Sequence, residues 1–119
     1  MRIEIQTQNF SLTDALRSHV QRRLRLTQAR FGEHVQRIVV RLSDINGPRG
    51  GEDKRCHVQI ILKQLPDVVV EDVEADLYVA IDRASDRASR TVERRLSRSR
   101  ARERSTGLID EPLPSTAEV

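Results

Sequence analysis

Aromatic side chains are almost absent from this chain, at 3% of its 119 residues. They are Phe10, Phe31 and Tyr78. Proteins that bind single-stranded nucleic acid stack bases on exposed aromatic rings, so the sequence argues against that mode of binding. A core has to be built from Val, Ile, Leu and Ala instead.

Cysteine and long apolar runs are scarce as well. Cys56 is the only cysteine, so no intrachain disulfide can form, which suits a reducing cytosol. No apolar run approaches the length of a membrane span, and Met1 leads into a polar alternating segment unlike a signal peptide. We therefore expect a cytoplasmic protein with no membrane partner.

Lysine is also rare, at 2 residues against 19 arginines, and the net charge of +3 conceals a segregation of charge. Residues 1–30 carry +4 and residues 83–104 carry +6, whereas residues 31–82 carry −4 and residues 105–119 carry −3. Both basic blocks coincide with segments of helical period. Because guanidinium groups pair bidentately with phosphate, this distribution indicates a polyanionic partner.

Hydrophobic periodicity predicts six elements. Alternation of apolar and polar residues indicates strands, and apolar residues three and four apart indicate helices. The predicted strands are residues 2–7, 37–44, 55–64 and 68–71, the last ending near residue 72. The first predicted helix follows the N-cap Thr13 and ends at Phe31, before Gly32. The second begins at Glu74 or Asp76 and runs to about Arg104.

This order, β-α-β-β-β-α, predicts an α+β domain over residues 1–104. The last three strands have short turns and should form an antiparallel meander, and both helices should cover one face of the four-stranded sheet. Residues 46–51 are predicted to be a hairpin connection with Arg49 at its tip. Residues 105–119 have no period and contain prolines, so we expect a disordered acidic tail.

The second predicted helix carries a row of arginines beside its apolar stripe. Steps of four, three, four and four residues keep the row on one helical face. No acidic residue interrupts it, and Asp82, Asp86 and Glu93 are assigned to the far polar side of the helix. A solvated structural face would interleave opposite charges, so we interpret the row as a phosphate-binding surface. Its members are Arg83, Arg87, Arg90, Arg94 and Arg98.

The first predicted helix carries further candidate RNA-binding arginines. These are Arg17, Arg22, Arg23, Arg25 and Arg30. Arg22 and Arg25 point away from the apolar stripe, and Arg23 and Arg30 flank it. Scattered surface charge explains these residues equally well when the helix is taken alone. Since both helices should cover one face of the sheet, we expect their basic flanks to lie side by side as one positive strip.

Catalytic and metal-binding patterns are not found. His19, His34 and His57 show no metal-ligand spacing, and Cys56 is interpreted as a small core residue. The glycine-rich segment 46–51 lacks the Lys-Ser/Thr of a phosphate-cradling loop. We expect no enzymatic activity, no catalytic residue, no metal, no cofactor and no small-molecule substrate.

Two short runs, together with the order of elements, resemble a known family. The run LTDALR, residues 12–17, opens the first helix, and the run DLYVAID, residues 76–82, opens the second. Both are similar to the bacterial ribosome hibernation-promoting factors, also called ribosome-associated inhibitors. The resemblance covers residues 1 to about 100.

The resemblance implies a fold close to a double-stranded-RNA-binding domain with one extra strand. It implies binding to small-subunit ribosomal RNA in the channel for mRNA and tRNA, and silencing of ribosomes in starvation or stationary phase. It also implies that the chain is the short form, without the C-terminal dimerisation domain, and is a monomer when free. The positions that match basic residues of the family are Arg17, Arg22, Arg23, Arg87, Arg90 and Arg94. The other candidates, Arg25, Arg30, Arg83 and Arg98, rest on helical geometry alone.

Two other functions stay open. A general double-stranded-RNA-binding module would bind free duplex RNA as tightly as it binds ribosomes. A protein-interaction module would present the basic second helix to an acidic partner surface.

Overall fold

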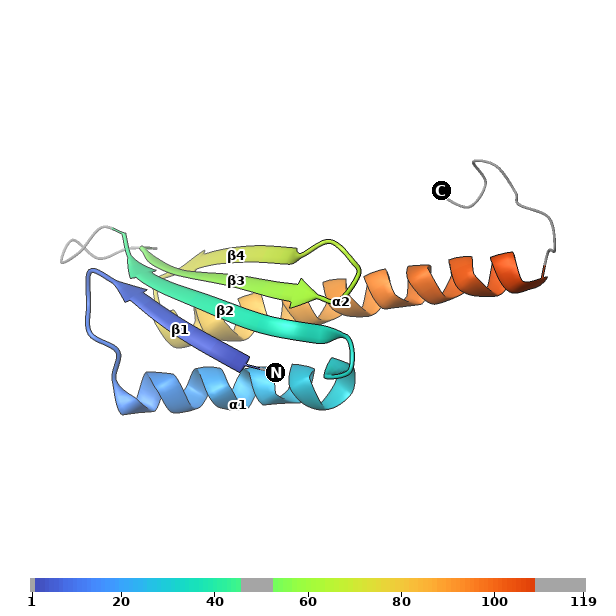
Figure 1. Cartoon of the computed structure of the whole chain (residues 1–119). Helices are drawn as coiled ribbons and strands as arrows, with labels where there is room; N and C mark the ends of the chain where they lie inside the picture. The colour runs from blue at the N-terminus through green and yellow to red at the C-terminus, as the bar shows by residue number, and fades with distance from the viewer. Residues whose placement is uncertain (1, 46–52, 109–119) are drawn as a thin grey trace.

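The computed structural model describes residues 2–45 and 53–108, which form one mixed sheet and two helices (Figure 1). The predicted hairpin connection at residues 46–51 lies outside the described residues, as does most of the predicted tail. The elements are β1 (Arg2–Gln8), α1 (Asp14–Phe31), β2 (Val35–Asp44), β3 (Lys54–Leu62), β4 (Val68–Glu74) and α2 (Leu77–Leu108). The predicted order of elements is confirmed.

Element ends differ from the predictions where side-chain contacts override the local pattern. β4 runs to Glu74 rather than ending near Asp72, because arginines of α2 pair with both carboxylates and let the strand continue. β3 ends at Leu62, since Gln64 adopts a φ of 65° and turns the chain. α2 continues to Leu108, past the expected end near Arg104.

The sheet has the strand order β1-β2-β3-β4. β1 pairs with β2 in parallel through the α1 crossover, and the other pairs are antiparallel, which confirms the predicted meander. The register aligns Ile5, Val40, Val58 and Val70 in one row across all four strands. Because successive residues point to opposite faces, this row faces the helices and the next residue of each strand faces outward.

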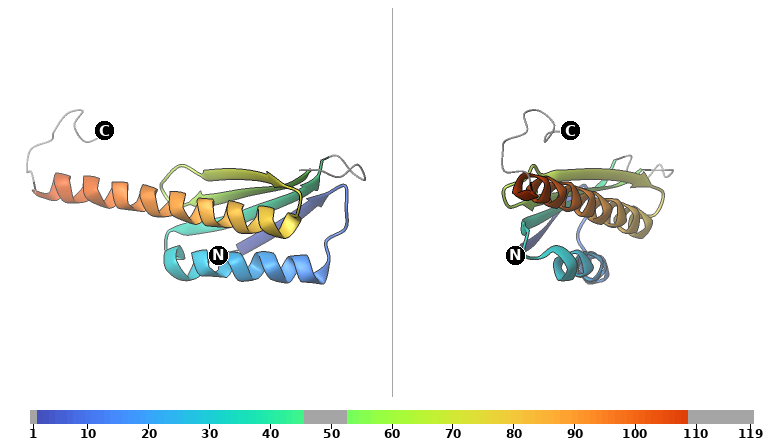
Figure 2. Two further views of the ribbon diagram at one scale, coloured as in Figure 1. Left: turned by 180° about the vertical axis from the view of Figure 1, so that it is seen from behind. Right: turned by 90° about the vertical axis from the view of Figure 1, so that its right-hand side faces the viewer.

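Both helices cover the same face of the sheet (Figures 1 and 2). The predicted apolar stripe of α1 is buried, and on α2 four of the five predicted stripe residues are buried while Leu77 is half-buried. The buried residues are Leu16, Val20, Leu24, Thr27 and Phe31 on α1, and Ile81, Ala84, Ala88 and Val92 on α2, joined there by Ala80 and Leu96. Small alanines on α2 permit a close approach to β3 and β4, the strands that it contacts most. Neither described helix has an apolar stretch long enough to cross a bilayer.

Each helix starts with a side-chain cap. The Thr13 hydroxyl accepts a hydrogen bond from the Leu16 amide at 3.1 Å, and Asp14 lies in the positive first turn. At α2, the Asp76 carboxylate accepts from the Tyr78 amide at 2.8 Å. Thr13 and Asp76 are therefore confirmed as helix-start residues.

Replacing Thr13 by Ala removes the α1 cap and leaves the Leu16 amide without its acceptor. We expect Thr13→Ala to lower the free energy of unfolding by about 1 kcal/mol, measured by urea denaturation. The control is Ser18→Ala, an exposed position on the same helix, which should change stability by less than about 0.5 kcal/mol. Equal effects of the two variants would contradict the capping role.

Candidate nucleic-acid interface

The arginine row of α2 lies on the solvent side, as predicted. All five side chains, Arg83, Arg87, Arg90, Arg94 and Arg98, are exposed. The row follows the flank of α2 that faces β4, because Arg83 and Arg87 both reach acidic residues of that strand. The position of the row is therefore fixed by the rotation of α2 on the sheet.

No acidic residue lies within the row along the helix, as predicted, but three of its arginines have carboxylate partners outside it. Arg83 Nη1 lies 3.4 Å from Glu74 Oε2, and Arg87 Nη1 lies 3.2 Å from Asp72 Oδ1. Arg90 pairs with Asp86 one turn earlier on α2. Carboxylates from β4 and from the neighbouring helical position thus relieve the repulsion that the row alone would create.

The acidic flank of α2 faces α1, which corrects two predictions. Asp82 Oδ1 lies 2.7 Å from His19 Nε2 and 3.2 Å from Arg23 Nε. Glu93 Oε2 lies 3.2 Å from Arg30 Nη2. Asp82 and Glu93 are therefore not on a far polar side, but in the contact between the helices. Because α1 packs against this flank and the arginine row lies on the β4 side, the two basic flanks do not meet as one strip.

Five of the ten candidate arginines have no carboxylate partner among the described residues: Arg17, Arg22, Arg25, Arg94 and Arg98. All five are exposed, and Arg94 donates only to the Thr91 hydroxyl, at 3.2 Å. The other five, Arg23, Arg30, Arg83, Arg87 and Arg90, each have one carboxylate partner. The helix surface thus offers both unpaired and loosely paired guanidinium groups.

Three arginines of the row surround one hollow between α2 and β4. Arg87, Arg90 and Arg94 line it with Thr91 and Val70, and its volume is about 310 Å³. We call it the arginine hollow. These are the three positions on α2 that the family resemblance identifies, and the structure brings them together on one surface.

Two arginines also stabilise the open edge of β4. Arg87 Nη2 donates to the Glu71 carbonyl at 2.8 Å, and Arg95 Nη1 donates to the carbonyls of Pro66 and Asp67 at 2.7 and 2.6 Å. Exposed edge strands invite pairing with other chains; Arg87 occupies this edge at Glu71, and Arg95 holds the turn that leads into β4. Sequence reasoning missed Arg95, because its partners lie 28 and 29 residues away.

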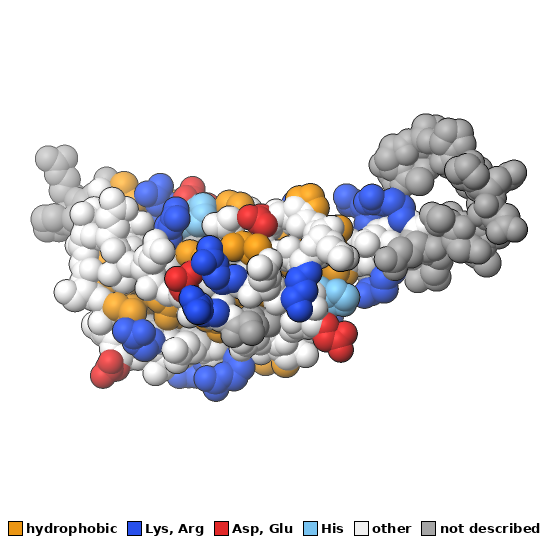
Figure 3. All heavy atoms as spheres, in the orientation of Figure 1, with side chains coloured by type: hydrophobic (Ala, Val, Ile, Leu, Met, Phe, Trp, Pro, Cys, Tyr) orange, Lys and Arg blue, Asp and Glu red, His pale blue; other side chains and the backbone are white. Residues whose placement is uncertain are grey.

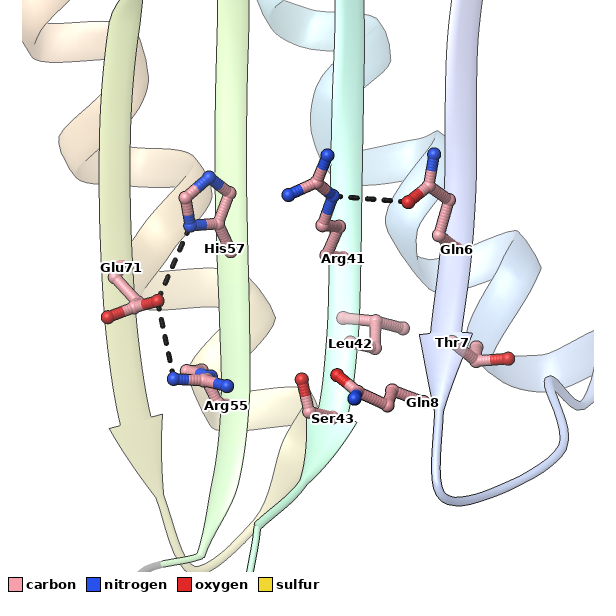
Figure 4. Close-up of a pocket in the computed structure, with 9 residues that line it drawn as sticks. All are labelled: Gln6, Thr7, Gln8, Arg41, Leu42, Ser43, Arg55, His57 and Glu71. Carbon is pink, nitrogen blue, oxygen red and sulfur yellow. Dashed lines mark hydrogen bonds and ion pairs between the residues drawn. The ribbon is translucent and has the colours of Figure 1, made fainter.

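The outer face of the sheet carries a separate polar hollow of about 440 Å³ (Figure 4). Gln6, Arg41, His57 and Glu71 form one row across the four strands. Arg41 Nε donates to Gln6 Oε1 at 3.1 Å, and His57 Nδ1 lies 3.4 Å from Glu71 Oε2. The charges on this face are mixed, with basic side chains scattered among acidic and apolar ones (Figure 3). The face therefore lacks the one-sided positive charge of the helix surface.

The titratable groups do not form a reactive centre in the described part of the chain. Burial and the nearby Asp72 carboxylate raise the pKa of Cys56 to about 12, so its thiol stays protonated at neutral pH. No three His, Cys, Asp or Glu side chains of the described residues converge as metal ligands. The chemistry offered by the site is cationic recognition.

A family model described as Sigma 54 modulation protein / S30EA ribosomal protein matches residues 3–100 of the chain. Among solved structures, the N-terminal domain of Protein Y from Thermus thermophilus aligns with a TM-score of 0.66 and 35% identity. That alignment covers 79% of this chain and 98% of the Thermus chain. No curated protein sequence matches significantly.

A second similar structure is a ribosomal subunit interface protein from Coxiella burnetii. It aligns with a TM-score of 0.69 and 17% identity, over 82% of this chain and 99% of its own. At that identity the likeness concerns the fold. The predicted α+β architecture is thus shared with both solved structures.

Arg87 and Arg94 should differ in their effect on stability although they line the same hollow. Arg87→Ala leaves the Asp72 carboxylate, which is only 13% exposed, without its partner, so we expect a loss of about 1–2 kcal/mol in urea unfolding. Arg94→Ala should change stability by less than about 0.5 kcal/mol, because no carboxylate depends on it. A destabilisation by Arg94→Ala equal to that of Arg87→Ala would disprove this division of roles.

Proposed function

The chain belongs to the Sigma 54 modulation protein / S30EA ribosomal protein family, the family of the ribosome hibernation factors, and on this premise we propose that it inhibits translation by binding the small ribosomal subunit. It lies in the channel for mRNA and tRNA, contacts small-subunit ribosomal RNA, and excludes both ligands sterically. It acts in the cytoplasm as a monomer, during starvation or stationary phase. No chemical step is required, because occupancy of the channel is sufficient.

The arginine hollow is the observation that carries this proposal. Arg87, Arg90 and Arg94 line one hollow with a volume of about 310 Å³. Phosphate is the ligand that suits three neighbouring guanidinium groups. Arg22 and Arg25 on α1 add exposed, unpaired cations to the helix layer of the domain. The resulting contact surface includes both helices. The carboxylates Asp82 and Glu93, which pair with residues of α1, lie between the two helices in the middle of this surface.

The ion pairs within this surface do not prevent RNA binding. The Arg90 side chain is 65% exposed and Asp86 is 49% exposed, and exposed pairs of this kind contribute only about 0–1 kcal/mol. A phosphate can therefore take the place of Asp86 at small cost. Arg87 differs, because its Nη1 and Nη2 atoms both donate hydrogen bonds to residues of β4. We therefore expect Arg87 to fix the position of α2 beside the hollow and to contact phosphate only at the edge of the hollow.

The aromatic residues favour recognition of the RNA backbone over recognition of bases. Phe31 is buried in the core, and Tyr78, which is 38% exposed, uses its ring in an edge-on contact with His19 at a centroid distance of 5.0 Å. Phosphate contacts position a protein on RNA but carry no sequence information. Specificity for the ribosome then comes from the arrangement of phosphates in folded ribosomal RNA.

The proposal predicts salt-sensitive binding to small subunits. The protein should sediment with purified small subunits at 50 mM salt and be released at several hundred millimolar, because phosphate contacts displace counterions. Arg90→Glu/Arg94→Glu should weaken this binding by more than about tenfold, and should abolish inhibition of cell-free translation. Both residues are exposed and the Arg90–Asp86 pair contributes only about 0–1 kcal/mol, so the variant should stay folded with a small decrease in its thermal midpoint.

The matched control reverses two exposed arginines outside the helix layer. Arg2→Glu/Arg41→Glu changes the net charge equally, on β1 and β2, and should leave binding within about twofold of wild type. No sedimentation of the wild-type protein at low salt would disprove ribosome binding. Equal affinity for a free RNA duplex would point to a general duplex-binding module instead.

A further inference from the structure

The C-terminal part of α2 extends beyond the folded body of the domain. α2 continues to Leu108, whereas Leu96 is its last buried residue among the described side chains. Figures 1 and 2 show this helix running past the end of the sheet with no other element beside it. We call residues 97–108 the α2 extension.

The described side chains of the extension, from Ser97 to Arg102, offer no apolar face to a protein partner. From Ser97 to Arg102 no side chain is buried, and Ala101 is the only apolar residue. A helix that docks in a protein groove or a coiled coil needs apolar anchors three and four residues apart. Those anchors are missing here, so the surface chemistry favours a polyanion.

The described arginines of the extension lie on more than one side of the helix. Arg98 and Arg102 are one turn apart, whereas Arg100 lies about 200° around the axis from Arg98. All three are exposed, and Figure 3 shows basic side chains gathered on the part of α2 beyond the sheet. A helix with cations on opposite sides suits a space with phosphates on both walls, such as a groove or a junction of folded RNA.

The extension continues past the part of the chain that the family shares. The family match ends at residue 100, inside the extension, and the helix continues for two more turns. We infer that the α2 extension is an additional ribosomal-RNA contact, which inserts between phosphate walls next to the main binding surface. This inference rests on the proposed function and specifies a second site for it.

The test removes the charges and keeps the helix. Arg98→Gln/Arg100→Gln/Arg102→Gln preserves helix propensity and should leave the thermal midpoint unchanged, because none of the three side chains is buried. We expect its affinity for salt-washed small subunits to fall by about tenfold or more. The slope of log affinity against log salt should become smaller by about 3, one unit per lost phosphate contact.

The matched control removes three arginines elsewhere. Arg2→Gln/Arg41→Gln/Arg55→Gln has the same net charge as the extension variant and should keep the wild-type slope. An extension variant with wild-type affinity and slope would overturn the inference, while binding by the wild-type protein would leave the proposed function standing. An equal loss in the control would also overturn it, because the effect would then be one of net charge.

Two further measurements separate RNA from a protein partner. With extracted, refolded small-subunit RNA, the extension variant should show the same loss of slope; a loss seen only with whole subunits would assign the contact to a ribosomal protein and contradict the inference. In hydrogen exchange, amides of residues 97–108 should exchange more slowly on the ribosome than in the free protein. Unchanged exchange there would exclude the insertion.

Discussion

The rotation of α2 about its own axis is the constraint on which the rest of the structure depends. Ala80, Ala84 and Ala88 are fully buried and bring the helix close to β3 and β4, so only one face of α2 fits the sheet. Once that face is fixed, the acidic flank must face α1 and the arginine row must face β4. This orientation of α2 on the sheet determines the ion pairs, the arginine hollow and the contact of Arg87 with the edge of β4.

Most of the fold could be predicted from the sequence, because its signals are local. Alternation predicts the inward row through Val40 and Val58, and the cap residue Thr13 predicts the start of α1, whereas the start of α2 is predicted only as Glu74 or Asp76. The end of β4 could not be predicted in this way. Asp72 and Glu74 are poor residues for the inner side of a strand unless a cation reaches them, and their partners lie on α2.

The candidate site was predictable as a set of exposed side chains, but not as a surface. Helical periodicity predicts which arginines point away from the core. It does not predict which flank of one helix packs against the other helix. The pairing of Asp82 with His19 and Arg23 joins residues about sixty positions apart, and no pattern within either helix encodes it. The prediction of a single positive strip was wrong for this reason, whereas nine of the ten candidate arginines are exposed and Arg23 is half-buried between the helices.

Under the proposed function, the paired arginines give the surface a selectivity that a row of free cations would lack. Each internal carboxylate competes with an incoming phosphate, so an isolated anion gains little by displacing it. Ribosomal RNA presents many phosphates in a fixed arrangement, and it can satisfy the unpaired Arg22, Arg25, Arg94 and Arg98 at the same time as it replaces weak partners such as Asp86. The sum of these contacts grows with the match between the two surfaces. For the proposed ribosomal-RNA contact, we therefore infer that internal ion pairing reduces indiscriminate attraction to polyanions and reserves tight binding for an RNA surface of complementary shape.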